Sequence, residues 1–262
     1  MKAVIFTAVF AVASIFLGCQ SQFAQERSII ITPDLSTTHK KQPVLVELFT
    51  SEGCNTCPPA DRVLAKLQKD QPIQNADVIT LGFHVTYWDN GAWKDRFSSI
   101  EYTRRQQMYA QIFRLDKVYT PQMVVDGSSE LVGSEREKAK DVIIKSAARP
   151  KGPIDLKIDN GKLRINISGL TTHDDAVVFV AVAESKLTTN VGGGENSGNK
   201  LEHSSVVRDL IPIIVVKGTD NNLNIEWALT VNKDWKTENL KYVVFVQEKN
   251  TLKILAVNQT GP

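Results

Sequence analysis

Two cysteines three positions apart, Cys54 and Cys57, are the residues of this sequence whose type and spacing most directly suggest chemistry. Such a pair can bind a metal, form a permanent disulfide or exchange electrons with other thiols. A structural zinc site takes four Cys or His ligands, and none of the four histidines lies at finger-like spacing. A permanent disulfide here would close a very small loop and stabilise the fold little. The sequence therefore favours a redox pair.

The elements around the pair must place it at the start of a helix. The apolar run 44–49 is bounded by Pro43 and the turn 51–53, and it predicts a buried strand. From Pro58 onward apolar residues recur at helical spacing, and prolines are tolerated in a first helical turn. A helix start carries partial positive charge, which stabilises a thiolate. We therefore predict that Cys54 is the nucleophile, more exposed and more acidic than Cys57, the resolving thiol.

The next elements alternate between strand and helix up to residue 147. Residues 77–85 predict a second buried strand, and 121–134 predict a hairpin that turns at Asp126-Gly127. Residues 98–115 predict a helix with Ser98 or Ser99 as its N-cap. Its expected inner face is Ile100, Met108, Ile112 and Leu115. A closing helix follows over 135–147.

The pattern changes after residues 149–153, which are rich in helix and strand breakers. From residue 154 onward, apolar residues alternate over several short runs, and the runs 177–182 and 242–246 are continuously apolar. This predicts an all-β, sandwich-like region of about seven strands. The glycine-rich segment 191–199 is interpreted as a plain loop. We predict a signal peptide over 1–19, a tether over 20–41 and two domains, 42–150 and 151–262.

The order of these motifs resembles the thioredoxin fold. A strand, a CxxC at a helix start, and Thr120-Pro121 before a hairpin and a last helix occur in its sequence order. More closely, the runs 47–61, 83–95 and 119–127 resemble a family of secreted bacterial thioredoxin-like proteins of unknown function, and the resemblance extends more weakly to the run 194–210. The resemblance implies an α/β thioredoxin-like domain followed by the all-β sandwich-like one. It also implies a cis bond between Thr120 and Pro121, opposite the cysteines, which guides peptide substrates.

Two groups of polar residues have roles that the sequence leaves open. Glu47 falls inside a predicted buried strand; the resemblance implies that it relays a proton to Cys57, and the alternative is a salt bridge at a strand edge. His84, Trp88 and Asp89 follow the second strand. With Thr120 they either line a substrate groove or belong to a packed loop, and Trp93 is expected to fill an interface between the domains. His203 and Arg208 are interpreted as structural.

The beginning of the chain resembles a bacterial lipoprotein signal. Lys2 precedes an uncharged apolar run, 3–17, that matches a secretory signal. Gly18-Cys19 resembles a lipobox, so we expect a lipid on Cys19, and Gln20 is typical of outer-membrane lipoproteins. The alternative is a plain signal peptide that leaves Cys19 inert or removed. After residue 20 no segment is apolar and long enough to span a bilayer.

Composition and charge exclude some functions. The 262 residues are 42% apolar with a formal net charge of +2, and no long basic run supports nucleic acid binding. We predict a cell-envelope thiol–disulfide oxidoreductase without cofactors that acts on cysteines of exported proteins. Two alternatives remain: Cu(I) handling by Cys54, Cys57 and His84, because thiolates select soft metals, or a non-enzymatic binding lipoprotein. The redox direction depends on Asn55 and Thr56 in ways that the sequence does not decide.

Overall fold

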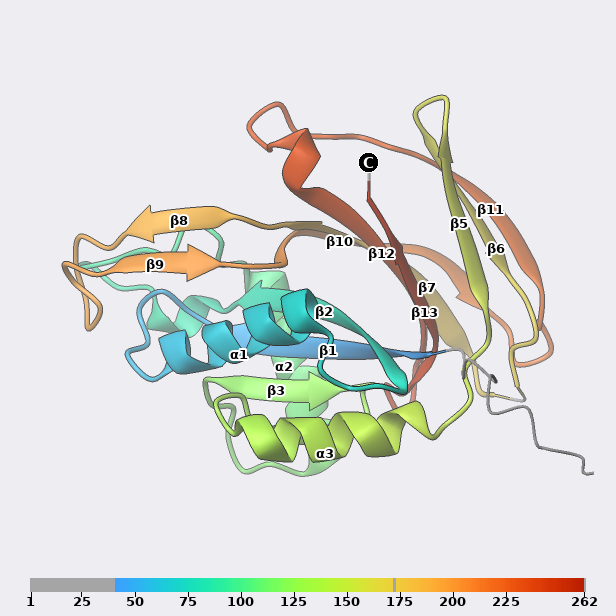
Figure 1. The fold of residues 1–262 in the computed structure, drawn as a ribbon, viewed down its shortest axis with the longest axis horizontal. Helices are drawn as coiled ribbons and strands as arrows, with labels where there is room; N and C mark the ends of the chain where they lie inside the picture. The colour runs from blue at the N-terminus through green and yellow to red at the C-terminus, as the bar shows by residue number, and fades with distance from the viewer. Residues whose placement is uncertain (1–40, 172, 262) are drawn as a thin grey trace, which may run out of the picture. The chain divides into compact units, whose positions relative to one another are not determined.

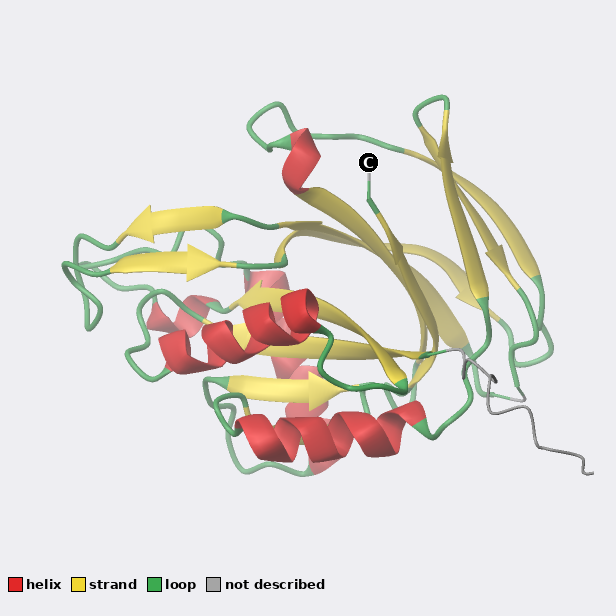
Figure 2. Cartoon of the chain, in the orientation of Figure 1, coloured by secondary structure: helices red, strands yellow, loops and turns green. Residues whose placement is uncertain are grey.

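The computed structural model describes residues 41–171 and 173–261. The predicted signal peptide, the Cys19 lipid site and nearly all of the predicted tether lie outside these residues. Within them the protein is a mixed α/β structure, mostly strands, with a large mixed sheet and three α-helices. Figure 2 shows how strands dominate.

The elements begin and end as follows. The helices are α1 (Cys57–Asp70), α2 (Ile100–Phe113) and α3 (Arg136–Ala147), with 3₁₀ turns η1 (Thr86–Trp88) and η2 (Thr237–Asn239). The strands are β1 (Gln42–Thr50), β2 (Ala76–His84), β3 (Gln122–Val125), β4 (Ser129–Val132), β5 (Ile154–Asp159), β6 (Lys162–Ile167), β7 (Ala176–Glu184), β8 (Leu187–Asn190), β9 (Lys200–His203), β10 (Val206–Val216), β11 (Leu223–Ala228), β12 (Leu240–Glu248) and β13 (Ile254–Thr260). The predicted strands and helices of residues 44–147 are confirmed, with small shifts at their ends.

One sheet joins the two parts of the sequence that the breakers at 149–153 separate. Its order is β13-β12-β7-β10-β2-β1-β3-β4, so strands from both parts belong to it (Figure 1). The junction is the parallel contact of β10 with β2, where Val206 is opposite Gly82 and the Gly82 N–H donates to the Ser205 carbonyl over 2.8 Å. The change of pattern after residue 153 therefore marks a change from mixed to all-β structure, while the large sheet continues across it.

The two faces of β1 enter different cores. Val44, Val46 and Leu48 pack with α1 and α3, while Leu45 and Phe49 point to the opposite face, toward α2. This follows from the alternation of side chains along a strand. In Figure 1, α1 and α3 lie in front of the sheet and α2 behind it.

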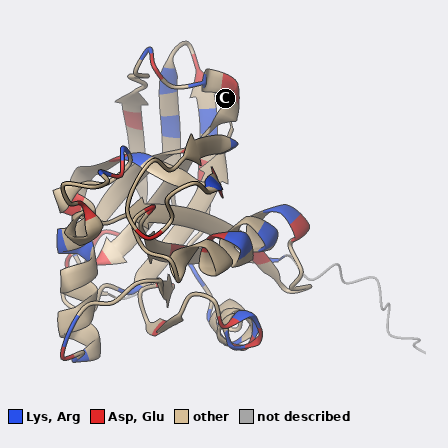
Figure 3. Cartoon of the chain, turned by 90° about the vertical axis from the view of Figure 1, so that its left-hand side faces the viewer, with Lys and Arg blue, Asp and Glu red and all other residues tan. Residues whose placement is uncertain are grey.

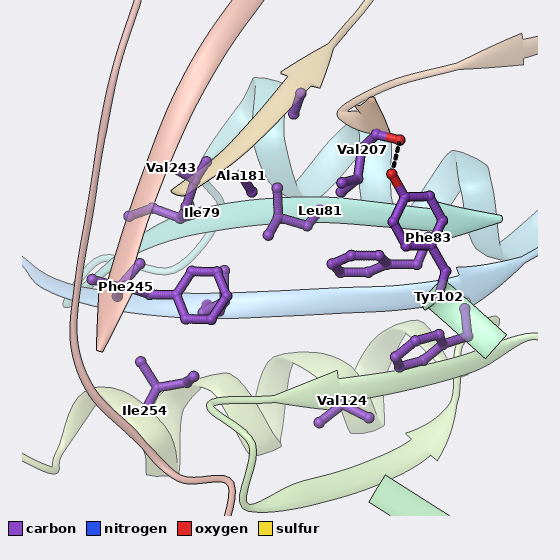
Figure 4. Close-up of a cluster of buried hydrophobic side chains, with 14 of the residues drawn as sticks. Ile79, Leu81, Phe83, Tyr102, Val124, Ala181, Val207, Val243, Phe245 and Ile254 are labelled. Atoms are coloured by element: carbon purple, nitrogen blue, oxygen red, sulfur yellow. Dashed lines mark hydrogen bonds between the residues drawn. The ribbon is translucent and has the colours of Figure 1, made fainter. Parts of the chain in front are cut away.

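The core on the α2 face joins residues from distant parts of the sequence. Phe83 of β2 meets Tyr102 of α2 edge to face, with ring centroids 5.2 Å apart. The Tyr102 hydroxyl donates to the carbonyl of Val207 on β10 over 3.1 Å, as drawn in Figure 4. Ile254 of β13 belongs to the same core. This core thus holds α2 against strands of both parts of the chain.

A third core lies under the small sheet β11-β6-β5. Inward residues of that sheet, such as Leu163 and Ile165, pack with Val178 and Val180 of β7 and Val244 of β12. The alternating apolar pattern of residues 154–167 thus covers one face of the β7, β10 and β12 region. In the described residues after 153, the only helical segment is the single turn η2.

The predicted inner face of α2 is wrong. Ile100, Met108 and Ile112 are 51%, 48% and 40% exposed, whereas Arg105 and Tyr109 are buried. The helix is rotated because Arg105 and Tyr109 bind Glu47, which projects from the centre of the sheet toward α2. The predicted N-cap is confirmed, since the Ser99 hydroxyl accepts from the Glu101 N–H over 3.2 Å.

The predicted hairpin turn at Asp126-Gly127 is confirmed. Both residues have positive φ, 47° and 62°, which suits a two-residue hairpin loop. A Cβ on Gly127 would lie 1.8 Å from the Leu252 carbonyl oxygen, so only glycine fits there. Asp126 also forms a buried ion pair of 2.7 Å with Lys151. This pair ties residues 149–153 to the hairpin.

Charges of both signs share the same elements. Figure 3 shows basic and acidic positions together on the helices and on the β5, β6 and β11 strands. Pairs such as Lys162–Glu226 at 3.0 Å are exposed and contribute little to stability. None of the helices in the described residues is long and apolar enough to cross a membrane.

Candidate redox site

Cys54 and Cys57 form a disulfide at the start of α1. Both cysteines are 0% exposed, so the prediction that Cys54 is the more exposed of the two is wrong for this oxidised state. The exposed residues of the motif are Asn55 and Thr56, which lie between the cysteines. Cys54 is buried because neighbouring loops pack on it, and the sequence pattern did not predict where these loops lie.

Cys54 has two hydroxyl groups beside its sulfur. Its Sγ lies 3.3 Å from the Thr56 hydroxyl, and the Thr120 hydroxyl donates to it over 3.4 Å. Cys57 is the first residue of α1, and its N–H donates to the Cys54 carbonyl over 3.2 Å. Hydroxyl donors stabilise a thiolate and lower its pKa, as does a helix start. This arrangement suits a reactive thiolate at Cys54.

Thr120 is held in place by Trp88. The Trp88 indole N–H donates to the Thr120 hydroxyl oxygen over 2.7 Å, which leaves the hydroxyl proton free for Cys54. Gln106 of α2 adds a bond of 2.7 Å from its amide to the Tyr119 carbonyl. The peptide bond between Thr120 and Pro121 is cis, as predicted. Thr120 and Trp88 therefore meet at Cys54.

The loop 191–199 covers the disulfide from the other side. The buried Asn196 side chain donates to the carbonyl oxygens of Glu52 and Cys54, over 2.8 and 3.0 Å. Glu195 accepts from the Asn55 N–H over 3.2 Å. A Cβ on Gly193 would lie 2.0 Å from the Ala92 carbonyl oxygen, so the loop can pack this closely only with glycine there. The segment interpreted as a plain loop is thus a cover of the redox motif.

Two histidines and two carboxylates form a buried polar cluster beside the motif. His84 Nδ1 lies 2.6 Å from Asp95 Oδ2, and His203 Nε2 lies 3.2 Å from Glu52 Oε1. Burial alone would lower the pKa of His84, but Asp95 raises it above the ordinary value. Burial likewise opposes ionisation of Asp95, yet His84 brings its pKa down to about 2. The His84–Asp95 pair is therefore charged over a wide pH range.

Trp93 borders this cluster. Its indole N–H donates to Glu52 Oε2 over 3.1 Å, and a Cβ on Gly192 of the covering loop would lie 3.4 Å from the Trp93 ring. Trp93 therefore lies between Glu52, in the first part of the chain, and the covering loop of the second part, which agrees with its predicted place. Asp89 accepts from the Asp95 N–H over 3.1 Å and from the Ser98 hydroxyl over 2.7 Å, so it fixes the loop after β2.

Asp61 on α1 also faces the cluster. With Thr50, His84 and His203 it lines one small cavity. Burial raises the pKa of Asp61, and the nearby His203 and His84 only partly oppose this. Asp61 comes one helical turn after Cys57, and residues four apart lie on the same face of a helix. The side of the site next to Cys57 thus contains an acid that holds its proton more firmly than usual.

Glu47 belongs to a different network. Arg105 binds both of its carboxylate oxygens, over 2.6 and 2.9 Å, and the Tyr109 hydroxyl donates to it over 2.6 Å. Gln247 accepts from Arg105 over 3.0 Å and donates to Tyr109 over 2.9 Å. Among the described residues, no hydrogen bond joins Glu47 to Cys57. The contacts therefore match the salt-bridge alternative, in a buried form.

The main cavity of the described residues lies apart from the disulfide. In residues 41–171 and 173–261, no group of three or more His, Cys, Asp or Glu side chains is placed to hold a metal ion. A cavity of about 680 Å³ lies between α2 and the strands β7 and β10, and neither cysteine lines it. Its walls include Phe179, Leu210 and Met108.

Known proteins are similar to this chain over most of its length. A family model matches residues 45–247, which is more than half of the chain. The chain belongs to the DUF1223 family, described as proteins of unknown function. A search of curated proteins gave no significant match.

Two solved structures are similar to this member of the DUF1223 family. A crystal structure of an Agrobacterium tumefaciens protein is 25% identical, with a TM-score of 0.70 over 85% of this chain and 95% of that one. HBP35 of Porphyromonas gingivalis is 14% identical, with a TM-score of 0.55 over 85% of this chain and 76% of that one. The second likeness concerns the fold alone.

Sequence reasoning missed four residues of the site in this DUF1223 protein. They are Glu52, Asp61, Asn196 and His203. Asp61 has a signal in the sequence, because its spacing of four from Cys57 places both on one helix face. The other three have no such spacing: Glu52 lies in the turn before the motif, and Asn196 and His203 reach it from a loop and from the end of β9, more than a hundred residues away. Their signal is the family resemblance of the runs 47–61 and 194–210, which contain them. Of the predicted residues, Thr120, Trp88 and His84 lie around the motif, and Glu47 lies apart from it.

Proposed function

We propose that this protein is a thiol–disulfide oxidoreductase of the cell envelope, in which Cys54 and Cys57 exchange disulfides with exported proteins. The observation that carries the proposal is the environment of Cys54. Its sulfur is within hydrogen-bond distance of two hydroxyl groups, and its disulfide partner is the first residue of α1. A permanent structural disulfide has no need of groups that stabilise a thiolate.

The element order of residues 42–147 supports the prediction that this part of the chain has a thioredoxin-like fold. It runs β1-α1-β2-α2-β3-β4-α3, with the cysteines between β1 and α1 and Thr120-Pro121 before β3. The strands after residue 153, with the small sheet β11-β6-β5, support the prediction that the second part of the chain is sandwich-like. The second part then supplies the covering loop 191–199 to the redox motif of the first part.

The reaction proceeds by two thiolate attacks. In the oxidising direction, a substrate thiolate attacks the Cys54 sulfur, the Cys54–Cys57 bond breaks, and Cys57 leaves as a thiolate that takes up a proton. A second substrate thiolate then attacks the mixed disulfide at the substrate sulfur. The substrate gains a disulfide, and the protein gains two electrons as the two thiols of Cys54 and Cys57. The reducing direction is the reverse, so no cofactor takes part.

The covering loop must move before a protein substrate reaches Cys54. Both sulfurs are fully buried in the disulfide state, whereas attack requires access along the disulfide bond. The bonds from Asn196 to Glu52 and Cys54 are among the contacts that hold the loop closed. Trp88 and Thr120 then form one wall of the opened site and are positioned to contact a substrate chain.

The predicted location remains part of the proposal. A lipid on Cys19 and a tether over residues 20–41 would hold the domain at the outer membrane, among exported proteins. The protein then needs no membrane-spanning helix, because acyl chains contribute about 0.8 kcal/mol per buried CH₂. Mass spectrometry of the native N-terminus, compared with Cys19→Ser, tests this. A mature chain that begins beyond residue 19 and carries no lipid would show a freely secreted protein.

Trapping of substrates tests the proposed activity. Cys57→Ala should accumulate mixed disulfides with envelope proteins, because the resolving thiol is missing. Cys54→Ala is the matched control and should accumulate far fewer. Equal trapping by both variants, or none by either under oxidising conditions, would contradict the proposed activity.

A further inference from the structure

The buried thiol of Cys57 needs a proton acceptor during exchange. Cys57 is fully buried, and a buried thiolate is costly because desolvation disfavours the charged form. When Cys57 attacks a mixed disulfide on Cys54, it must first lose its proton. Water has no direct access there in the closed protein. A neighbouring side chain that accepts this proton would remove the difficulty.

We infer that Asp61 is that acceptor, and that the histidines of the buried cluster position it. The inference rests on the proposed thiol–disulfide chemistry. Asp61 comes four residues after Cys57 on α1, which separates their Cβ atoms by about 5–6 Å. The Cα–Cβ bonds of a helix tilt toward its N-terminus, so that of Asp61 leans toward the turn that begins with Cys57. The geometry of α1 thus places one carboxyl on the same helix face as the resolving thiol, one turn away.

Ionisable groups of both signs surround Asp61. His84 at the end of β2 and His203 at the end of β9 face it, with Thr50 of β1 and the more distant Asp95. Glu52 belongs to the same cluster through its contact with His203. Positive charge on either histidine favours the Asp61 carboxylate, while burial raises its pKa. A carboxyl whose pKa is raised by burial binds a proton more readily than an exposed one, which suits a general base.

An unsatisfied nitrogen marks this cluster as more than a structural network. His203 Nδ1 has no hydrogen-bond partner within the described structure, and the His203 side chain is only 2% exposed. The other ring nitrogen, Nε2, faces Glu52 Oε1 at 3.2 Å. Buried polar groups in proteins are nearly always bonded, so the unpaired nitrogen requires an explanation. A site that changes its protonation during the reaction provides one.

Glu47 is not placed to accept the proton of Cys57. All three of its hydrogen bonds come from α2, from Arg105 and Tyr109. Its strand neighbours Leu45 and Phe49 belong to the core on the α2 face, whereas α1 packs on the other face of the sheet. Proton transfer from Cys57 would have to cross the sheet to reach it. The acid that the resemblance implies on β1 is thus replaced by an acid on α1.

The proton balance of the inferred step is simple. The Cys57 S–H gives its proton to an Asp61 carboxylate oxygen, and the resulting thiolate attacks the Cys54 sulfur of the mixed disulfide. The Cys54–Cys57 bond forms, and the other thiol leaves as a thiolate. Asp61 then returns the proton to that thiolate or to solvent. No further oxidant or reductant is needed.

A two-phase reaction of the reduced protein with 5,5′-dithiobis(2-nitrobenzoate) isolates this step. The first release of chromophore reports attack by Cys54, and the second reports attack by Cys57 on the mixed disulfide. Asp61→Asn should slow the second phase by about a hundredfold, in line with general base catalysis, and leave the first unchanged. Asp61→Glu should recover much of the second phase. Asp70→Asn, an exposed acid at the far end of α1, is the matched control and should change neither.

Each outcome separates the inference from the proposed function. Two phases in the wild type with an unchanged second phase in Asp61→Asn would overturn the role of Asp61 and leave the exchange activity standing. Absence of a second phase in the wild type would overturn the exchange activity itself. A titration of Cys57 in the Cys54→Ser protein gives a readout without a change at Asp61. Its thiolate should form in two steps, because two groups share a proton; a single ordinary thiol step would overturn the inference.

Discussion

Thr120 Oγ1 donates a hydrogen bond of 3.4 Å to Cys54 Sγ, although 66 residues separate them in the sequence. The bond joins the loop before β3 to the turn before α1. Since Trp88 occupies the acceptor side of the same hydroxyl, the proton of Thr120 is directed at the sulfur. The reactivity of Cys54 therefore depends on a residue of another element, and this dependence can be measured.

Thr120→Val removes that donor while keeping the shape of the side chain. A hydrogen bond to a charged group contributes about 1.5–3 kcal/mol, so the pKa of the reduced Cys54 thiol should rise by about one unit or more. The pH dependence of iodoacetamide alkylation measures it, in a Cys57→Ala background. Thr120→Ser keeps the hydroxyl and should behave like the wild type. An unchanged profile in Thr120→Val would show that the bond does not stabilise the thiolate.

Asn196→Ala should open the cover of the redox motif. It removes two hydrogen bonds to backbone carbonyls, each contributing about 1 kcal/mol. The open fraction of the loop, and with it the rate of disulfide reduction by dithiothreitol, should rise about thirtyfold, because about 1.4 kcal/mol corresponds to a factor of ten. Asn199→Ala is the control in the same loop, because its side chain is exposed. If both variants are reduced at the wild-type rate, loop 191–199 does not limit access.

Arg105→Leu should strongly destabilise the fold. It leaves Glu47 buried without its partner, which costs about 3–5 kcal/mol. Arg104→Leu, next to it on the exposed side of α2, breaks only the surface pair with Glu101 and should change the free energy of unfolding by less than about 1 kcal/mol. Urea denaturation compares the two. Equal effects would mean that the Glu47–Arg105 pair is not a buried structural contact.

The His84–Asp95 pair should make stability depend on pH at both ends. The lowered pKa of Asp95, about 2 against 3.8, means that its contribution is present above pH 3.8 and is lost as pH falls toward 2. The raised pKa of His84 means that its contribution is present below pH 6.5 and is lost as pH rises through the folded value. The stability difference between wild type and Asp95→Asn should therefore peak between pH 4 and 6.5.

The expected size of this effect at the acid end is about 2 kcal/mol, since one pKa unit corresponds to about 1.4 kcal/mol. Urea denaturation of both proteins from pH 2 to 8 measures it. Asp61 is present in both proteins, so its own titration largely cancels in the difference. A difference that is constant across this range would show that the pair is not linked to folding.

The sequence predicts those parts of the fold that local patterns decide. The hairpin turn at Asp126-Gly127 follows from residues that tolerate positive φ, and the helix start at Ser99 follows from its capping hydroxyl. The strand β1 follows from an apolar run. In each case the stabilising contact lies within a few residues of the pattern that predicts it.

What the sequence does not predict depends on distant partners. The periodicity of 98–115 places Ile100 and Met108 inside, but the buried Glu47 on β1 rotates the helix so that Arg105 and Tyr109 face the core. Asn196 and His203 reach the redox motif only because β10 joins β2 in one sheet. Pairing of this kind leaves no periodic signal in either segment.

Redox titration of the purified protein in glutathione buffers shows whether Cys54 and Cys57 exchange disulfides. The oxidised and reduced fractions of Cys54–Cys57 are read by alkylation and mass spectrometry. We expect full reversibility with a potential of about −120 to −270 mV, the range of disulfide oxidoreductases. A disulfide that stays oxidised to about −300 mV or below, or that is reduced only when the protein unfolds, would be a structural bond, and Cys54–Cys57 would then not be a redox pair.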